Sequence, residues 1–361
     1  MKILIDMGHP AHVHLFKNFI WEMETRGHEV RVTARDKEVT QNLLKAYNIP
    51  YTLIEGKKHS LIQEWISRDI QMAKFARKSN PDIFLGVLNP VTAHSAKVLR
   101  KPSITLNDTE HAKIGTITTL PFTTVALTPS CFLKNIGKKQ IRYNSYHELA
   151  YLHPDYFTPN PAVLNELDLK REDTFMILRF VSWNASHDKG QSGIKEKIKF
   201  VSDLKQYGRV FITSENTLPR ELEHHRIQVS PEKLHDLLYY AALYVGEGGT
   251  MAAEAAVLGT PSIFVSSLAG TMGNFIELED TYDLLYSFTD SDAAFVRAAE
   301  ILRNSSCKEA WRMKLERLLN DKIDITAFMV WFTENYPLSI AEMKKHPGIQ
   351  YFCTSDSGDA Q

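Results

Sequence analysis

The chain has few cysteines and no excess of charge of either sign. Its 361 residues include Cys131, Cys307 and Cys353, and no two of these have the close spacing of paired metal ligands. Three isolated thiols argue against a disulfide scaffold and fit a reducing compartment, so we expect a cytoplasmic protein. The 42 Lys and Arg residues face 43 Asp and Glu residues, so the overall charge does not predict nucleic acid as a partner.

Long apolar runs are absent as well. The apolar stretches have the length of strands and are interrupted by polar residues, far below the roughly 20 residues of a membrane-spanning helix. Residues 1–6 form a strand pattern in place of a charged leader with a cleavage site, so we expect no signal peptide. Peripheral attachment at the inner face of a membrane stays open.

What the chain does contain is a repeated alternation of strand and helix patterns. With 361 residues and 43% hydrophobic content, two domains are expected. The first alternation ends with a strand at residues 122–127, and the second begins near residue 174, which is typical of two doubly wound parallel sheets. Prolines between residues 154 and 161 indicate a hinge. We therefore predict an α/β protein with domains at residues 1–160 and 161–323.

The end of the chain carries weaker patterns. Residues 324–336 predict a short amphipathic helix. Residues 337–361 finish in small polar side chains and predict a flexible tail.

The most informative stretch joins a short apolar strand at residues 241–245 to an alanine-rich helix at residues 250–258. The glycines of residues 246–249 permit a tight turn at the start of that helix. Amides at a helix N-terminus carry partial positive charge, and glycine lets a ligand approach the backbone, so a phosphate or pyrophosphate is the expected guest. Glu254 is suited to accept hydrogen bonds from sugar hydroxyls. A plain connecting turn is the alternative.

The order Gly-Gly-Thr, then Glu, then Gly-x-Pro before an apolar strand resembles the nucleotide-sugar motif of GT-B glycosyltransferases. It is most similar to the lipid-linked N-acetylglucosaminyltransferase of peptidoglycan synthesis and to the non-hydrolysing UDP-N-acetylglucosamine 2-epimerases. The resemblance implies that Gly248, Gly249 and Thr250 face a diphosphate and that Glu254 faces the ribose. A pair of glutamines in the transferase is replaced around Asn274, which we count among the donor-binding candidates.

Three histidines, His9, His12 and His14, follow the first strand. No acidic or cysteine partner stands beside them, so we expect no metal site. His9 is predicted to be a turn residue before Pro10, and His12 and His14 cannot share one helix face. The transferase family carries Gly-Gly-His in its first loop, and this resemblance places His12 near the reacting sugar or phosphates.

Asp108, Glu110 and His111 form the densest acid and base cluster in the chain, just after the strand predicted at residues 102–106. Helix capping by Asp108 is an alternative that needs no chemistry. We predict Glu110 as the general base, with His12, His111 and Asp108 as the other catalytic candidates.

Two basic residues of the second domain are candidates for neutralising a diphosphate. Arg179 lies at the end of a predicted strand and Lys189 lies in the loop that follows. An ordinary surface charge is the alternative for Arg179, and simple solvation is the alternative for Lys189.

The opening Asp6-x-x-His9-Pro10-Ala11-His12, the Asp108–His111 cluster, Ser182–Ala185 and the Gly-Gly-Thr motif together are typical of one family. By these residues the chain is identified as a member of domain-of-unknown-function family 354 of the GT-B clan, to about residue 336. The resemblance implies two Rossmann-like domains facing a cleft, with a C-terminal helix that crosses back onto the first domain.

The resemblance also implies a glycosyltransferase of surface polysaccharide or glycolipid synthesis. Its donor would be a nucleotide-diphosphate sugar, with UDP-N-acetylhexosamine favoured, used as a substrate and not as a tightly bound cofactor. Its acceptor would be a sugar or a lipid-linked sugar. A nucleotide-sugar epimerase or hydrolase, and a non-catalytic nucleotide-binding member of the fold, remain alternatives.

Overall fold

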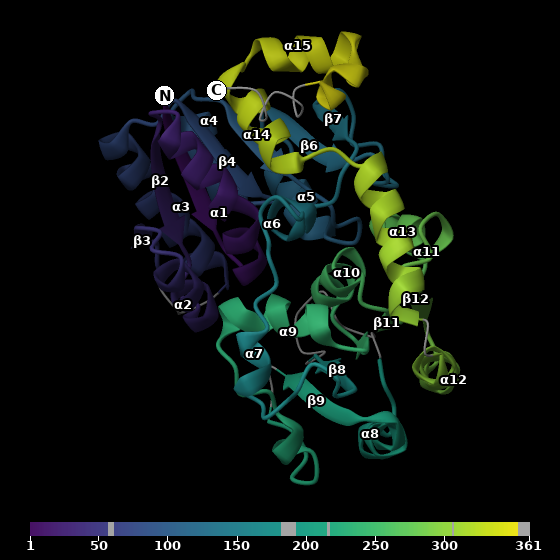
Figure 1. The fold of residues 1–361 in the computed structure, drawn as a ribbon. Helices are drawn as coiled ribbons and strands as arrows, with labels where there is room; N and C mark the ends of the chain where they lie inside the picture. The colour runs from purple at the N-terminus through teal and green to yellow at the C-terminus, as the bar shows by residue number, and fades with distance from the viewer. Residues whose placement is uncertain (57–60, 182–192, 215–216, 305–306, 353–361) are drawn as a thin grey trace. The chain divides into compact units, whose positions relative to one another are not determined.

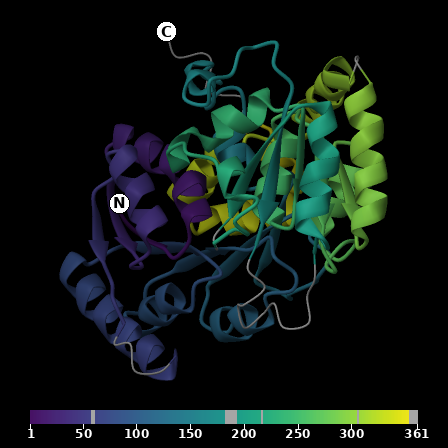
Figure 2. The ribbon, with the colours of Figure 1, turned by 90° about the horizontal axis from the view of Figure 1, so that it is seen from below.

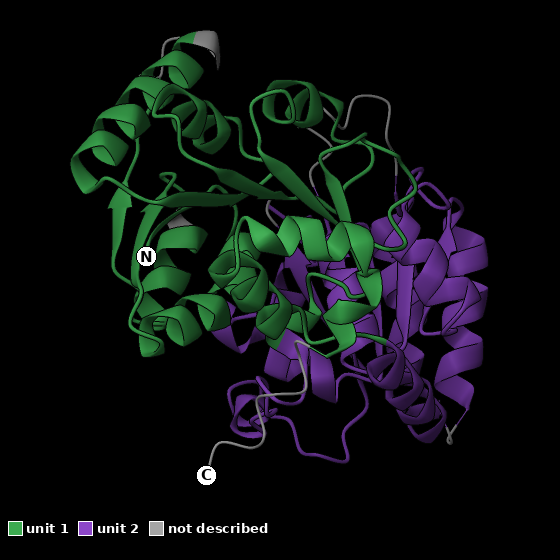
Figure 3. Ribbon diagram, turned by 90° about the horizontal axis from the view of Figure 1, so that it is seen from above, with its two compact units in different colours: residues 1–151, 322–361 green, residues 152–321 purple. Residues whose placement is uncertain are grey.

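The chain divides into two compact units, which we call unit 1 and unit 2 (Figure 3). Unit 1 contains residues 1–151 and 322–361, and unit 2 contains residues 152–321. The computed structural model describes residues 1–56, 61–181, 193–214, 217–304 and 307–352.

The boundary between the units falls at residue 151, before the predicted boundary at residue 160. The proline-containing segment after residue 151 is anchored in unit 2 on helix α9 (Leu234–Tyr240). The amide of Asn160 donates to Asp236 Oδ1 at 2.8 Å, and Tyr240 Oη donates to the carbonyl oxygen of Pro159 at 3.3 Å. These contacts make the segment part of unit 2.

Unit 1 is built on a seven-stranded sheet in the order β3-β2-β1-β4-β5-β6-β7. Its strands are β1 (Lys2–Met7), β2 (Glu29–Ala34), β3 (Tyr51–Leu53), β4 (Ile83–Val87), β5 (Ser103–Leu106), β6 (Val125–Pro129) and β7 (Gln140–Tyr143). All neighbouring strands pair in parallel. Helices cover both faces of such a sheet, which explains why β1, β4, β5 and β6 are almost continuously buried.

The sheet therefore extends one strand beyond the predicted last strand. β7 has only four residues, and its side chains alternate between partly exposed and buried. A pattern this short at a sheet edge does not distinguish a strand from a loop.

The helices of unit 1 form two layers. Helices α1 (Pro10–Thr25) and α2 (Glu38–Ala46) contact each other, while α4 (Pro90–Val98) contacts both α3 (Leu61–Ser79) and α5 (Lys113–Thr119). Figure 2 shows the dark blue helices of the second group on one side of the sheet and the purple helices of the first group on the other. Met72 and Ala76 of α3 pack with Leu4 and Phe84 of the sheet in one buried cluster.

The C-terminal segment returns to unit 1, as predicted. Helix α14 (Ile325–Glu334) contacts α1, and Thr326 Oγ1 donates to the carbonyl oxygen of Ala150 at 3.0 Å (Figure 1). The prediction of a flexible tail is wrong for residues 338–351, which form helix α15 (Leu338–Lys345) and the 3₁₀ turn η4 (Pro347–Tyr351). The amide of Asn144 donates to Gln350 Oε1 at 2.7 Å, so this tail is held by residues far away in the sequence.

Unit 2 contains a five-stranded parallel sheet in the order β12-β11-β10-β8-β9. Its strands are β8 (Phe175–Phe180), β9 (Arg209–Ser214), β10 (Leu243–Gly246), β11 (Ser262–Val265) and β12 (Leu285–Phe288). Its other helices include α8 (Lys197–Leu204), α10 (Gly249–Val257), α11 (Gly273–Asp280), α12 (Ser291–Arg303) and α13 (Cys307–Asp321). Within the described part of the chain, no helix is long and apolar enough to cross a bilayer.

Candidate functional site

The glycine turn, residues Gly246–Gly249, joins β10 to α10 as the sequence predicts. A Cβ at Gly246 would overlap Tyr244 Oη and lie 2.8 Å from Arg179 Cβ, so the chain passes too close to its neighbours for a side chain. Gly248 is the N-cap residue of α10 and has no side chain that could accept from the first amides of the helix. The partial positive charge of the helix N-terminus is therefore not offset by a capping side chain.

Arg179, at the end of β8, lies beside this turn. A Cβ placed on Gly248 would be 3.2 Å from Arg179 Cγ, and the Arg179 guanidinium donates to Thr213 Oγ1 at 2.9 Å. The start of α11 is also close, because a Cβ on Gly249 would meet the ring of Phe275 at 3.6 Å. Unit 2 thus brings the turn, Arg179 and the neighbourhood of Asn274 together.

Asn274 itself makes a local contact, in which its Oδ1 accepts from the amide of Phe275 at 3.0 Å. The other basic candidate, Lys189, lies outside the described residues. A role for either residue toward a sugar nucleotide stays a prediction.

Glu254 is buried within α10, with 4% of its surface exposed. Its Oε1 lies 3.0 Å from Nε2 of His235 on α9, which is equally buried. One oxygen of this carboxylate is therefore already paired with an imidazole. The sequence does not reveal that Glu254 pairs with His235. The two residues lie on different helices, and the apolar pattern of one helix does not indicate which residue of the other it contacts.

Glu247, inside the glycine turn, is a residue that the sequence analysis missed. It is 3% exposed and accepts from the amides of Val181 and Ile194, both at 2.8 Å. Its Oε2 also lies 3.2 Å from Lys197 Nζ. This buried carboxylate ties residues 181 and 194 to the turn. The sequence does carry a signal for this residue, because Glu247 stands between two glycines at the end of an apolar strand.

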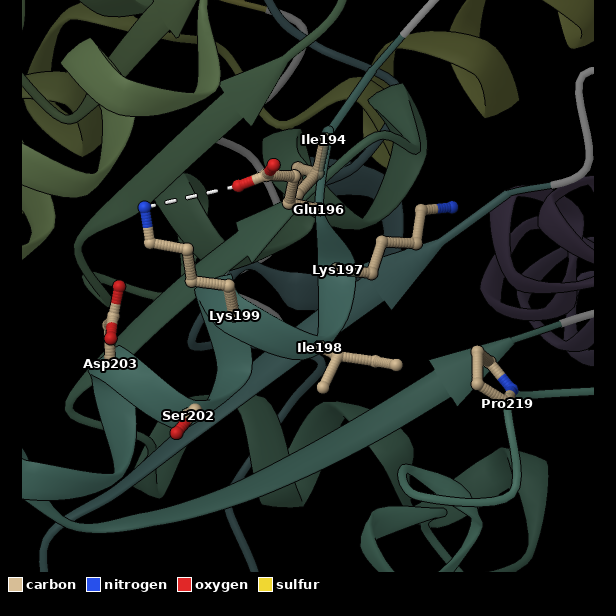
Figure 4. A pocket seen from close by; sticks show the side chains of 8 residues that line it. All are labelled: Ile194, Glu196, Lys197, Ile198, Lys199, Ser202, Asp203 and Pro219. Atoms are coloured by element: carbon tan, nitrogen blue, oxygen red, sulfur yellow. Dashed lines mark ion pairs between the residues drawn. The ribbon is translucent and has the colours of Figure 1, made fainter.

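An open hollow of about 780 Å³ lies at the start of α8 (Figure 4). Its lining includes Glu196 and Lys199, whose charged groups are 3.9 Å apart, and both side chains are largely exposed. The glycine turn does not line this hollow. We assign it no chemical role, because none of the predicted site residues contributes to it.

In unit 1, the loop after β5 meets the segment after β7. Asp108 Oδ2 lies 2.9 Å from Nδ1 of His147, and Thr109 Oγ1 donates to Asp108 Oδ1 at 2.9 Å. Burial alone would raise the pKa of Asp108, but the charge and hydrogen bond of His147 lower it to about 2. Burial opposes protonation of His147, yet Asp108 raises the pKa of that imidazole above its ordinary value. The two side chains form an ion pair in which His147 is buried and Asp108 is partly exposed.

His147 was not predicted as a site residue. It is 8% exposed, and among the described residues its Nε2 has no hydrogen-bond partner. The sequence analysis overlooked it because it left β7, the strand that carries His147 to this edge, unassigned. A donor that is buried and unpaired in this way is unusual in a folded protein.

The charges of His147 and Asp108 both act on the pKa of His12, on the first loop of unit 1. Burial, followed by the neighbouring His9, lowers the pKa of His12 to about 3. Its Nδ1 accepts from the amide of Gly8 at 3.3 Å, so the ring is neutral and carries its proton on Nε2. His12 is therefore a neutral hydrogen-bond donor near neutral pH.

The other two histidines of the first loop have structural roles. His9 is the N-cap of α1, and its Nδ1 accepts from the amide of Ala11 at 3.2 Å. His14 is buried, with its ring stacked on Tyr151 at 5.3 Å between centroids and its Nδ1 3.3 Å from Tyr47 Oη. In the described part of the chain, no three His, Cys, Asp or Glu side chains converge as metal ligands.

Asp108 does not cap a helix, so that alternative interpretation is wrong. Helix α5 has Ala112 as its N-cap and receives no side-chain hydrogen bond there. Glu110, which is 4% exposed, accepts from the amide of Leu133 at 3.1 Å and thus holds the loop after β6. His111 follows in the same turn and is partly buried. The structure does not test the general-base role that the sequence predicts for Glu110, and what it shows is this contact with the loop after β6.

Comparison with known proteins supports the fold. An uncharacterised protein of Methanocaldococcus jannaschii is 23% identical over 278 residues, covering 73% of this chain and 81% of the relative. The UDP-GlcNAc 2-epimerase of Neisseria meningitidis bound to UDP-GlcNAc superimposes with a TM-score of 0.63 at 13% identity, covering 89% of this chain and 100% of that chain. The spinosyn rhamnosyltransferase SpnG gives 0.59 at 13% identity, with 93% and 100% covered.

These solved structures share the two-sheet architecture of GT-B glycosyltransferases and UDP-GlcNAc 2-epimerases, and the chain has that fold. One family profile, described as "Protein of unknown function (DUF354)", matches residues 1–332. The matched region runs from β1 into α14 and includes both the glycine turn and the Asp108–His147 pair. The chain therefore belongs to the DUF354 family.

Proposed function

We propose that this protein is a glycosyltransferase that uses a nucleotide-diphosphate sugar, with a UDP-N-acetylhexosamine as donor, in the synthesis of surface polysaccharide or glycolipid. The glycine turn carries this proposal. The uncapped N-terminus of α10 and the adjacent Arg179 supply positive potential, and the buried carboxylate of Glu247 holds the turn in place. Uncapped backbone amides beside a guanidinium group suit a diphosphate.

The nature of the donor is supported by the solved relatives. One epimerase of the same fold is described as bound to UDP-GlcNAc. In our proposal the same chemical class of ligand binds to unit 2 of this chain, with Glu254 toward the ribose and Gly248 to Thr250 toward the phosphates.

In our proposal the acid and base groups of unit 1 serve a transfer reaction. Transfer needs one base to take the proton of an acceptor hydroxyl, and His147 oriented by Asp108 suits that task once it is neutral. Glu110, whose Oε1 accepts from the amide of Leu133, has a structural role in this proposal. His12, as a neutral donor, is suited to hydrogen-bond a sugar or phosphate oxygen.

The experiment is incubation of the full chain with a panel of UDP-, GDP- and CDP-sugars, with and without sugar and lipid-linked acceptors. Release of free nucleotide that depends on acceptor supports the proposal. An isomerised nucleotide sugar without acceptor would assign the epimerase activity, and binding without turnover would assign a non-catalytic role. His147→Gln, which keeps a polar side chain but no base, should lower turnover at least about 100-fold.

A further inference from the structure

Residues 83–147 of unit 1 have a strong excess of positive charge. They contain eight Lys and Arg residues and only two acidic residues, whereas the whole chain is nearly neutral. The two acids are Asp108 and Glu110, and both are engaged in the site described above. The eight basic residues are Lys97, Arg100, Lys101, Lys113, Lys134, Lys138, Lys139 and Arg142.

Helix α5 presents apolar side chains within this basic region. Ile114 is 60% exposed and Ile117 is 72% exposed, and their spacing of three places both on one face of the helix. Phe122, just after the helix, is 41% exposed. Large aliphatic side chains this exposed, gathered in one place, commonly mark an interaction surface.

The lysines and the apolar side chains share one surface. A shallow hollow of about 550 Å³ is lined by both kinds of residue. Its lining includes Ile117 of α5 together with Lys138 and Lys139. We call Ile114, Ile117, Lys113, Lys138 and Lys139 the α5 surface. Ile117 and the two later lysines line the hollow, and Lys113 and Ile114 lie one turn of α5 before Ile117.

The α5 surface is held firmly from beneath. His94 on α4 lies 2.9 Å from the carbonyl oxygen of Thr118 and 2.9 Å from Asp69 of α3, and its ring contacts Phe122 with centroids 4.5 Å apart. Lys139 Nζ donates to the carbonyl oxygen of Leu120 at 2.9 Å. The apolar side chains are thus presented by an ordered support.

We propose that the α5 surface docks onto an anionic phospholipid bilayer. Exposed aliphatic side chains flanked by lysines are suited to enter the interfacial region while the ammonium groups contact lipid phosphates. A second copy of the same surface is a poor partner, because like charges would face each other. A nucleic acid is a poorer fit as well, because the exposed isoleucines of α5 would gain little from contact with backbone phosphates.

The position of α5 in the chain gives this docking a consequence. The helix begins at Lys113, directly after the loop that carries Asp108 and Glu110. Docking would bring this loop close to the bilayer surface, where a lipid-linked acceptor would be presented. This last point rests on the proposed function, whereas the docking itself does not.

The test is co-sedimentation of the full chain with vesicles, in the absence of any sugar nucleotide, so that its outcome is independent of the proposed function. We expect binding to phosphatidylcholine vesicles containing phosphatidylglycerol, little binding to phosphatidylcholine alone, and weaker binding as salt is raised. The double variant Lys113→Glu, Lys138→Glu should weaken binding to the anionic vesicles at least about tenfold. Each lysine near an anionic surface contributes roughly 1 kcal/mol to membrane binding.

The matched control reverses two charges elsewhere on the chain, at the adjacent exposed residues Lys344 and Lys345 of α15. Lys344→Glu with Lys345→Glu should leave binding unchanged. The apolar contribution is tested with Ile114→Ser and Ile117→Ser against Val296→Ser, a residue of α12 that is 57% exposed. No binding to anionic vesicles, equal loss in the control variants, or tighter binding to a DNA fragment than to vesicles would overturn the proposal.

Discussion

Replacing Asp108 with Asn should change how the stability of unit 1 depends on pH. The carboxylate lies 2.9 Å from the imidazole of His147, and its pKa is about 2 in the folded chain against an ordinary value of 3.8. At about 1.4 kcal/mol per pKa unit, this difference corresponds to about 2 kcal/mol of stability. Asp108→Asn should lose most of that stability at any pH at which Asp108 and His147 are both charged in the native protein.

The pH window follows from the direction of each shift. The lowered pKa of Asp108 gives stability that is present above pH 3.8 and is lost as the pH falls through about 2. The raised pKa of His147 gives stability that is present below pH 6.5 and is lost as the pH rises through its folded value. In Asp108→Asn, burial is the largest remaining influence on the pKa of His147 and lowers it. The variant therefore loses stability as the pH falls below 6.5, the opposite of the native protein.

Urea unfolding at about pH 5 and about pH 8 measures this change. We expect Asp108→Asn to lose about 2 kcal/mol at the lower pH and clearly less at the higher pH. Asp155→Asn is the matched control, because Asp155 lies 3.3 Å from His153 but is 71% exposed, so its loss should be small at both pH values. An equal loss at both pH values for Asp108→Asn, or a loss no larger than the control's, would refute the ion pair.

Three further substitutions test other carboxylates. Glu254→Ala should weaken UDP binding by about 1–3 kcal/mol in calorimetry, because a buried acceptor for the ribose is lost, and unchanged affinity in a folded variant would remove Glu254 from the site. Glu110→Gln should lower stability by about 1 kcal/mol and retain most turnover, because Glu110 accepts a hydrogen bond from the amide of Leu133. A turnover loss of about 100-fold at unchanged melting temperature would instead establish Glu110 as the base. Glu247→Ala should lower the free energy of unfolding by roughly 3 kcal/mol, because the amides of Val181 and Ile194 and the Lys197 ammonium lose their acceptor. Near-native stability in chemical unfolding would contradict the anchoring role of Glu247.

The sequence was sufficient for those parts of the fold that depend on local chemistry. The glycine turn of residues 246–249 and the helix behind it follow from backbone freedom and helix propensity, which neighbouring residues determine. The βαβ start of unit 1 follows from its apolar periodicity in the same way. These features were predicted at nearly the observed positions.

The parts that were missed depend on contacts between distant residues. His147 pairs with Asp108 across 39 positions of sequence, and His235 pairs with Glu254 from a different helix. The order of residues 338–351 likewise depends on Asn144 and its neighbours. Because no local pattern encodes such partners, the sequence identified Asp108 and Glu254 as candidates without revealing what each one touches.

Our central claim, that a diphosphate binds at the glycine turn, is tested most directly by calorimetric titration of UDP and of uridine into Gly249 variants. A side chain at Gly249 meets only the ring of Phe275 at 3.6 Å, and an aspartate in the first turn favours the helix, so Gly249→Asp and its neutral counterpart Gly249→Asn should both fold. We predict that Gly249→Asp abolishes UDP binding, that Gly249→Asn weakens it clearly less because it adds the same bulk without the charge, and that uridine binds weakly to all forms. UDP affinity that is unchanged in Gly249→Asp, or equal affinity for UDP and uridine in the native protein, would contradict the claim.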